Sequence, residues 1–273
     1  MICLGVKNMD NRPIGFMDSG VGGLTVVKAA KELMPNEAVV FIGDEARVPY
    51  GPRPTTEVIK FSQQMADFLI KQDVKALVIA CNTATNAAFQ ILSTTLPIPV
   101  IGVIQPGAQA AVATTRNNRI GVIATEGTIK SQAYSTALAA LAPQIEVFPV
   151  ACQSFVELAE HNQLTTPEAL QVIDQQLVGL KNQGIDTLVL GCTHFPLLAK
   201  GIQTAVGDQV KLVDPGVAAV QQLKDVLERQ GLLREATSTP DEQYFATANI
   251  ASFRTIAQNF LAPDIQVNLA KID

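Results

Sequence analysis

Two stretches of the chain align with each other without a gap, and this repeat decides the expected fold. Residues 69–83 read "LIKQDVKALVIACNT" and residues 180–194 read "LKNQGIDTLVLGCTH". Each combines a helix-like segment with a buried strand that ends in a cysteine, Cys81 or Cys192. A second match, 14–22 against 120–128, occurs upstream in the same order. Because repeats of this kind mark related structural units, the sequence predicts two similar halves.

Short runs rich in Val and Ile alternate with helix-patterned segments, which is typical of βαβ units. Strands are expected at 13–17, 38–43, 76–80, 99–103, 119–124, 145–150, 187–191 and 210–214. Apolar residues at helical spacing predict helices at 24–33, 56–72 and 167–183. The polar stretch 234–243 is expected to be a surface loop before a last strand and helix. The predicted fold class is therefore α/β, with two pseudo-symmetric lobes of mainly parallel sheet and an active site in the cleft between them.

The composition argues against several classes of protein, namely nucleic-acid-binding, membrane and exported proteins. The chain has 273 residues, of which 48% are hydrophobic and 16% charged, as expected for a globular protein large enough for two cores. A net charge of −5 without a basic block argues against nucleic acid as a partner. No apolar run is long enough for a bilayer, and the N-terminal segment lacks signal-peptide features, so we expect a cytoplasmic protein without a membrane partner. In that compartment Cys3, Cys81, Cys152 and Cys192 are expected to be thiols.

The residues around Cys192 allow three interpretations. The side chain could be a packed core thiol, a nucleophile activated by His194, or one partner of an acid–base pair with Cys81. Ligands of open α/β sheets bind at the carboxyl ends of strands, where both cysteines are expected. Two thiols on opposite faces of a carbon acid can remove and return its proton and thereby invert the centre. The repeat favours this third interpretation because it accounts for both cysteines.

Four motifs connect the chain with a known family. They are "GFMDSGVGGLTV" (15–26), "PYGPR" (49–53), "ACNTATNA" (80–87) and "LGCTHFPLL" (190–198). Their order and spacing resemble those of the glutamate racemase family, within the aspartate/glutamate racemase superfamily, and the resemblance extends over most of the chain. It implies a cofactor-independent isomerase that interconverts L- and D-glutamate and supplies D-glutamate for peptidoglycan, and so for cell-wall biogenesis and cell shape. It also implies glutamate as the small-molecule partner and a homodimer.

The same resemblance assigns roles to individual residues. Cys81 and Cys192 are the two catalytic acid/base groups, Cys81 acting on D-glutamate and Cys192 on L-glutamate. Asp18 and His194 assist proton transfer at the first and second thiol, and Glu160 matches a glutamate near the second. The implied substrate-binding residues are Asp18, Ser19, Tyr50, Gly51, Asn82, Thr83, Thr125, Thr193 and His194. From the residues alone, Asp18 could instead cap the following helix, and Glu160 could be a solvated helix residue. With two histidines and no clustered ligands, we expect no metal site.

The resemblance also implies that the C-terminal segment returns to the first lobe. Lobe 1 would then comprise residues 9–104 and 215–273, and lobe 2 residues 105–214. Three alternatives stay open on the sequence. An aspartate or hydantoin racemase of the same superfamily would use the same chemistry. A Cys192–His194 nucleophilic hydrolase would leave Cys81 without a role. A non-catalytic two-lobed binding protein would leave both matched thiols unexplained.

Overall fold

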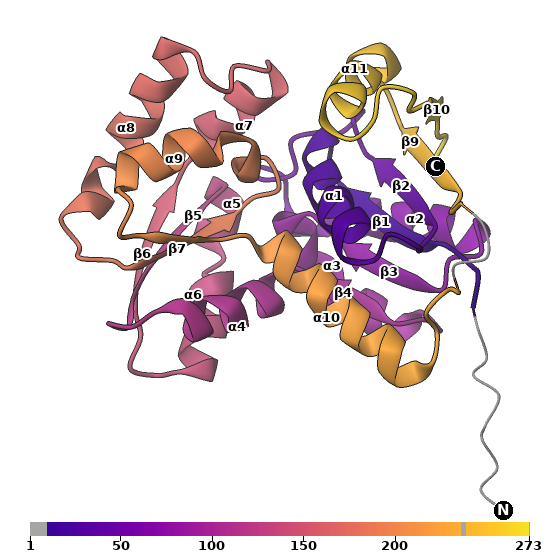
Figure 1. The fold of residues 1–273 in the computed structure, drawn as a ribbon, viewed down its shortest axis with the longest axis horizontal. Helices are drawn as coiled ribbons and strands as arrows, with labels where there is room; N and C mark the ends of the chain where they lie inside the picture. Colours follow the sequence, from indigo (N-terminus) through magenta and orange to yellow (C-terminus); the bar gives the residue numbers. More distant parts are fainter. Residues whose placement is uncertain (1–9, 236–238, 273) are drawn as a thin grey trace, which may run out of the picture.

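A computed structural model describes residues 10–235 and 239–272, so Cys3 lies outside the described residues. The chain forms two lobes, each built around one parallel sheet with helices on both faces (Figure 1). Within the described residues, no helix is both long and apolar enough to span a membrane.

The first sheet has six strands in the order β10-β9-β2-β1-β3-β4, and every neighbouring pair is parallel. Its strands are β1 (Ile14–Asp18), β2 (Val39–Gly43), β3 (Ala76–Ile79), β4 (Val100–Gly102), β9 (Glu242–Ala246) and β10 (Val267–Leu269). The helical elements of this part are η1 (Val21–Gly23), α1 (Leu24–Leu33), α2 (Thr55–Lys71), α3 (Asn82–Thr95), α10 (Pro215–Gln230) and α11 (Ile250–Phe260).

The second sheet has four parallel strands in the order β6-β5-β7-β8. These are β5 (Arg119–Ala124), β6 (Glu146–Ala151), β7 (Thr187–Gly191) and β8 (Lys211–Val213). The helical elements of this part are α4 (Ile104–Thr114), α5 (Glu126–Lys130), α6 (Ala133–Leu141), α7 (Gln153–Glu160), α8 (Pro167–Lys181), η2 (Phe195–Leu198) and α9 (Ala199–Val206). The order β6-β5-β7-β8 repeats the order β2-β1-β3-β4, with β5 in the place of β1 and β7 in the place of β3. The structure thus confirms the two related halves and the α/β fold class.

All eight expected strands and all three expected helices are present, with ends that differ by at most two residues. The C-terminal part differs in two respects. The expected loop 234–243 ends at Asp241, because Glu242 and Gln243 already pair with β2 as the start of β9. The chain also does not end on a helix: β10 follows α11 and pairs with β9 at the edge of the sheet. A strand of three residues with two exposed positions carries little apolar signal, which is why the pattern missed it.

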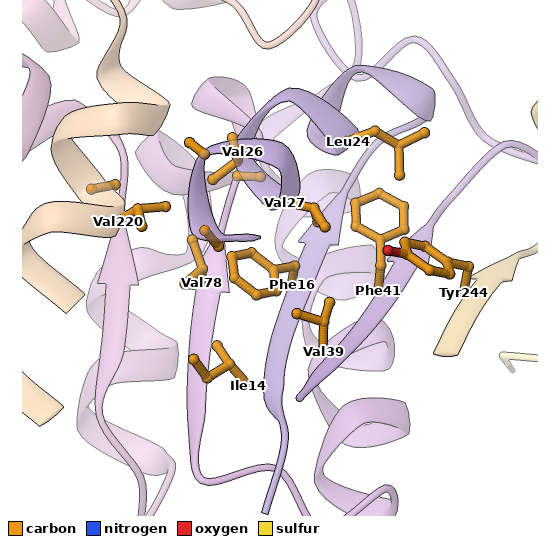
Figure 2. Packing of buried hydrophobic residues seen from close by; sticks show 14 of the residues in the cluster. Ile14, Phe16, Leu24, Val26, Val27, Val39, Phe41, Val78, Val220 and Tyr244 are labelled. Carbon is orange, nitrogen blue, oxygen red and sulfur yellow. The ribbon is translucent and has the colours of Figure 1, made fainter. Parts of the chain in front are cut away.

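Burial on both faces explains the continuous apolar strands. All five residues of β1 are buried, as are those of β2, since helices cover each side of the sheet. Figure 2 shows one of these faces, where Phe16 and Phe41 of the sheet meet Val27 of α1 and Val220 lies on α10 beside them. The C-terminal segment belongs to this same core, because Tyr244 of β9 packs within it.

Helices α4 and α10 lie where the chain passes between the two sheets. α4 follows β4 and α10 follows β8, and α10 packs against both α4 and α1 (Figure 1). The Asp214 side chain caps α10 by accepting a hydrogen bond of 2.8 Å from the Gly216 backbone N–H. The exact domain boundaries, 9–104 with 215–273 and 105–214, stay a prediction.

A buried ion pair in the first lobe yields a stability prediction. Lys75 and Glu37 have side chains 0% and 4% exposed, and Lys75 Nζ lies 2.6 Å from Glu37 Oε2. The ammonium also donates to the Asp10 and Leu232 carbonyls at 2.7 and 2.8 Å. Lys75→Met leaves the Glu37 carboxylate buried without its cation, so we expect the free energy of unfolding to fall by about 3–5 kcal/mol in urea denaturation.

Matched variants make this test specific. Adding Glu37→Leu to Lys75→Met should recover part of the loss, because it removes the uncompensated charge. Lys60→Met, at an exposed position of α2, removes the same charge and should stay within about 0.5 kcal/mol of wild type. A loss below about 1 kcal/mol for Lys75→Met would contradict the assigned importance of the pair.

Candidate active site

A pocket opens at the carboxyl ends of the strands, between the two sheets. The first sheet contributes residues that follow β1, β2 and β3, and the second contributes residues that follow β5 and β7. The lining residues are Ser19, Val48, Pro49, Tyr50, Gly51, Cys81, Asn82, Thr83, Thr125, Val156, Gly191, Cys192, Thr193 and His194. Both cysteines of the repeat therefore line one pocket, at the strand ends where α/β proteins bind ligands.

Cys81 occupies the N-cap position of α3, directly after β3. Its Sγ accepts a hydrogen bond from the Ala84 backbone N–H at 3.4 Å and donates to Ser19 Oγ at 3.6 Å. Burial raises the pKa of the thiol to about 12, and the nearby Asp18 carboxylate acts in the same direction. The Ala84 N–H and the Ser19 hydroxyl oppose this shift because they stabilise the thiolate. Cys81 is thus a protonated thiol in a site that already holds donors for its anion.

Cys192 follows β7 and is the first member of a three-residue chain. Its Sγ lies 3.6 Å from His194 Nδ1, and His194 Nε2 lies 2.6 Å from Glu160 Oε1 on α7. Burial alone would lower the pKa of His194, but the hydrogen bonds to Cys192 and Glu160 outweigh it and hold that pKa well above its usual value. An imidazolium at this position stabilises a thiolate on Cys192. The two thiols therefore have different surroundings, one with neutral donors and the other with a charged one.

Asp18 is the last residue of β1 and is not part of the pocket lining. Its Oδ2 accepts hydrogen bonds from the backbone N–H groups of Gly20 and Gly23 at 3.3 and 2.9 Å. The Thr193 hydroxyl, from the other lobe, lies 3.4 Å from each carboxylate oxygen. Burial raises the pKa of Asp18, and the charge of His194 works against that shift. Asp18 therefore organises the turn after β1 and also contacts the second lobe.

Three further residues support the pocket, and none of them was among the site residues expected from the sequence. The Tyr134 hydroxyl of α6 donates to Asn82 Oδ1 at 2.6 Å and fixes the orientation of that amide. Thr128 Oγ1 lies 3.1 Å from Thr125 Oγ1 and 3.4 Å from Thr83 Oγ1, so three hydroxyls form one cluster. Tyr134 lies outside every motif and repeat segment of the sequence, whereas Thr128 is the last residue of the repeat segment 120–128. Glu45, the third, lies four residues before the "PYGPR" motif (49–53).

The structure brings most of the expected site residues to the pocket wall. Of the expected set, Asp18 and Glu160 do not line it; they contact Thr193 and His194 from behind. Cys152 is fully buried in the core of the second lobe, and His161 is exposed at the end of α7. In the described part of the chain, no group of three or more His, Cys, Asp or Glu side chains is arranged to hold a metal ion.

The turn after β1 has no room for a side chain at Gly22. A Cβ there would lie 2.6 Å from Thr193 Oγ1 and 2.7 Å from His194 Nδ1, both closer than real contacts allow. Gly22→Ala must therefore displace the Thr193–His194 segment, and we expect a loss of catalytic efficiency of about 10²-fold. Steady-state kinetics measure this loss, and circular dichroism should show an unchanged fold.

A glycine with free space offers the control for this prediction. Gly179 lies on α8, and a methyl group added there would have no neighbouring atom within 4 Å, so Gly179→Ala should keep full activity. Equal activity of Gly22→Ala and wild type would show that the close approach of the lobes is not required.

The fold and site together define a class of protein: a two-lobed α/β protein with two thiols in a pocket between its sheets. Residues 24–223 match the model of the family described as Asp/Glu/Hydantoin racemase. The chain is 60% identical to a glutamate racemase of Pediococcus pentosaceus, over 97% of this chain and 100% of that protein. The chain therefore belongs to the Asp/Glu/Hydantoin racemase family, and as a racemase it is an isomerase.

Solved structures agree with this family. A glutamate racemase from Bacillus anthracis superposes with a TM-score of 0.92 at 40% identity, covering 96% of this chain and 98% of that one. A glutamate racemase from Francisella tularensis, solved in complex with D-glutamate, gives a TM-score of 0.89 at 37% identity, with 97% and 99% covered. The family expected from the four motifs is thereby confirmed, and so is the fold class.

Proposed function

We propose that the protein is a cofactor-independent glutamate racemase that uses Cys81 and Cys192 as its two acid/base groups. The observation that carries this proposal is the placement of both thiols in one pocket, each at the end of a corresponding strand of the two related halves. The identity with proteins named glutamate racemase supports glutamate as the substrate.

The surroundings of the two thiols suggest the starting state of the reaction. His194 as imidazolium favours a thiolate on Cys192, whereas the raised pKa of Cys81 keeps that group protonated. In this state the Cys192 thiolate takes the Cα proton of L-glutamate, and the Cys81 thiol gives its proton to the opposite face, which yields D-glutamate. The product complex holds a Cys81 thiolate and a Cys192 thiol. D-glutamate reacts from that state in reverse, so one proton leaves Cα and one returns in each direction.

Stabilisation of the carbanionic intermediate requires donors that are already in place. The N-terminus of α3, immediately after Cys81, presents backbone N–H groups and the positive end of the helix dipole to an anion. Hydroxyls of Ser19, Thr83, Thr125 and Thr193 surround the same pocket. Such preorganised donors lower the free energy of the anion in a site that excludes water. We assign them to the two carboxylates of glutamate.

The pocket is too tight for a substrate to enter unaided. Its cavity volume is about 20 Å³, enough for roughly one water molecule. Entry of glutamate therefore requires the lobes, or the residues that bridge them, to separate. The contact between Asp18 and Thr193 is one that such an opening would break.

From the resemblance of the four motifs we further propose that the product serves peptidoglycan synthesis in the cytoplasm and that the chain forms a homodimer. Light scattering of the purified protein tests the second point: a mass near twice that of the chain supports it, and a monomer mass at micromolar concentration contradicts it.

A substrate comparison tests the proposed function. L-glutamate and L-aspartate are incubated separately with the purified protein, without added cofactor, and the optical rotation is followed to zero. We expect glutamate to racemise at least about 10²-fold faster, because a side chain shorter by one methylene misplaces the distal carboxylate. Faster loss of rotation with aspartate would support the aspartate racemase alternative. Hydrolysis of a thioester or amide without racemisation would support the Cys192–His194 hydrolase.

A further inference from the structure

Glu45 is a buried carboxylic acid at the active site that has no part in the mechanism above. It lies in the loop that follows β2 and is 8% exposed. Its Oε1 is buried and has no hydrogen-bond partner among the described residues. An ionised carboxylate with an unpartnered oxygen is unfavourable inside a protein, because the buried charge is no longer hydrated by water. The position therefore favours the neutral acid.

Glu45 and Glu160 both approach Gly20, from different lobes. A Cβ placed on Gly20 would lie 3.1 Å from Glu45 Oε1 and 3.4 Å from Glu160 Oε1, so the two oxygens are no farther apart than the sum of these distances. Glu45 belongs to the first lobe and Glu160 to the second. Glu160 is in turn 2.6 Å from His194, which contacts Cys192. The chain of Cys192, His194 and Glu160 thus ends against a fourth titratable group from the opposite lobe.

The groups that affect the charge of Glu45 come from both lobes. Burial raises its pKa to about 7, and the Glu160 and Asp18 carboxylates act in the same direction, whereas the His194 imidazolium and the Asn249 amide oppose the shift. Glu45 thus changes charge near neutral pH, where an ordinary glutamate is already ionised. Below that pH Glu45 is neutral, so the group of Glu45, Glu160 and Asp18 carries one negative charge fewer than three ionised carboxylates would.

We propose that Glu45 is a positioning residue that acts through Glu160: as the neutral acid it leaves Glu160 as the single carboxylate paired with His194, and its ionisation weakens the binding of glutamate. The second half of this statement rests on the proposed function. Ionised Glu45 adds a negative charge beside a site that must accept a substrate with two carboxylates. A second carboxylate near His194, beside that of Glu160, also stabilises the protonated form of the imidazole.

The binding effect is tested by steady-state kinetics between pH 6 and 8.5. Glu45→Gln mimics the neutral acid at every pH, so at pH 6 its KM should match wild type within about twofold. At pH 8.5 the wild-type KM should exceed that of Glu45→Gln by about 3- to 10-fold, while Glu45→Asp, which still titrates, should retain a pH-dependent KM. Glu32→Gln removes the same charge at an exposed position of α1 and should follow wild type throughout. Parallel KM profiles of wild type and Glu45→Gln would overturn the binding effect.

The action through Glu160 is tested without substrate, by NMR titration of the imidazole signals. The chain has two histidines, so a His161→Gln variant assigns the His194 signal. Loss of the Glu45 charge should lower the pKa of His194 in Glu45→Gln by up to about one unit, since an anion nearby stabilises the imidazolium. The exposed His161 should titrate identically in both proteins. An unchanged His194 midpoint would refute the proposal. An absence of glutamate turnover in wild type would refute the proposed function and the binding effect that rests on it, and would leave the action through Glu160 to be decided by the titration.

Discussion

Cys81→Ala and Cys192→Ala variants should each racemise glutamate at least about 10³-fold more slowly than wild type, because in the proposed mechanism each lacks one of the two groups that transfer the Cα proton. In that mechanism neither remaining thiol can replace the other, since Cys81 and Cys192 belong to different lobes of the pocket wall. L- and D-glutamate are enantiomers with an equilibrium constant of one. Each variant must therefore lose the same factor of kcat/KM in both directions, and the polarimetric assay can be run from either enantiomer.

Cys152→Ala is the matched control for these variants. Cys152 is a fully buried thiol in the same lobe as Cys192, but it does not line the pocket. Its replacement should cost stability, visible in a lower melting temperature, while turnover stays within about twofold of wild type. A Cys81→Ala protein that racemises at nearly the normal rate would contradict the two-thiol mechanism and favour a site that depends on Cys192 alone.

His194→Asn should lower kcat/KM by about 10²-fold. Asparagine keeps a polar group beside Cys192 but carries no positive charge, so the thiolate of Cys192 loses its stabilising partner. The pH profile distinguishes this cause from simple misplacement. Asparagine does not ionise, so the pH dependence that the His194 imidazolium, with its raised pKa, gives to wild type should be absent from the variant.

His161→Asn is the control for the histidine variant, because His161 is exposed at the end of α7. It should behave as wild type at every pH. A His194→Asn protein whose activity falls uniformly, with the wild-type pH profile, would show that His194 only shapes the pocket and does not set the charge of Cys192.

The repeat of 69–83 and 180–194 was sufficient to predict the related halves and the position of both thiols at strand ends. It worked because strands β3 and β7 are buried on both faces, and a buried parallel strand is a continuous apolar run in the sequence. The pairing of β9 with β2 was different. Residues 242–246 and 39–43 are far apart in the chain, and an apolar pattern does not say which strand is the neighbour. Only the resemblance to a family implied that return.

The residues that support the site could not be predicted from the sequence, for a related reason. Tyr134 reaches Asn82 from a helix of the other lobe, and this contact depends on how the lobes meet. Glu45 looks in the sequence like any surface glutamate, and both its burial and its approach to Glu160 near Gly20 are seen only in the folded chain. Motifs point to the residues expected to contact a substrate. The neighbouring groups that shift the pKa values of those residues are brought close by tertiary packing, which a motif does not record.

Racemisation in deuterated water tests the central claim most directly. L-glutamate is incubated with the protein, without added cofactor, and D-glutamate is isolated at low conversion for mass and proton NMR analysis of Cα. In the proposed mechanism the proton delivered to the product comes from a thiol that has exchanged with solvent. We therefore predict D-glutamate with deuterium at Cα beside residual L-glutamate that is still protiated. D-glutamate that retains its original Cα proton would contradict the two-thiol mechanism.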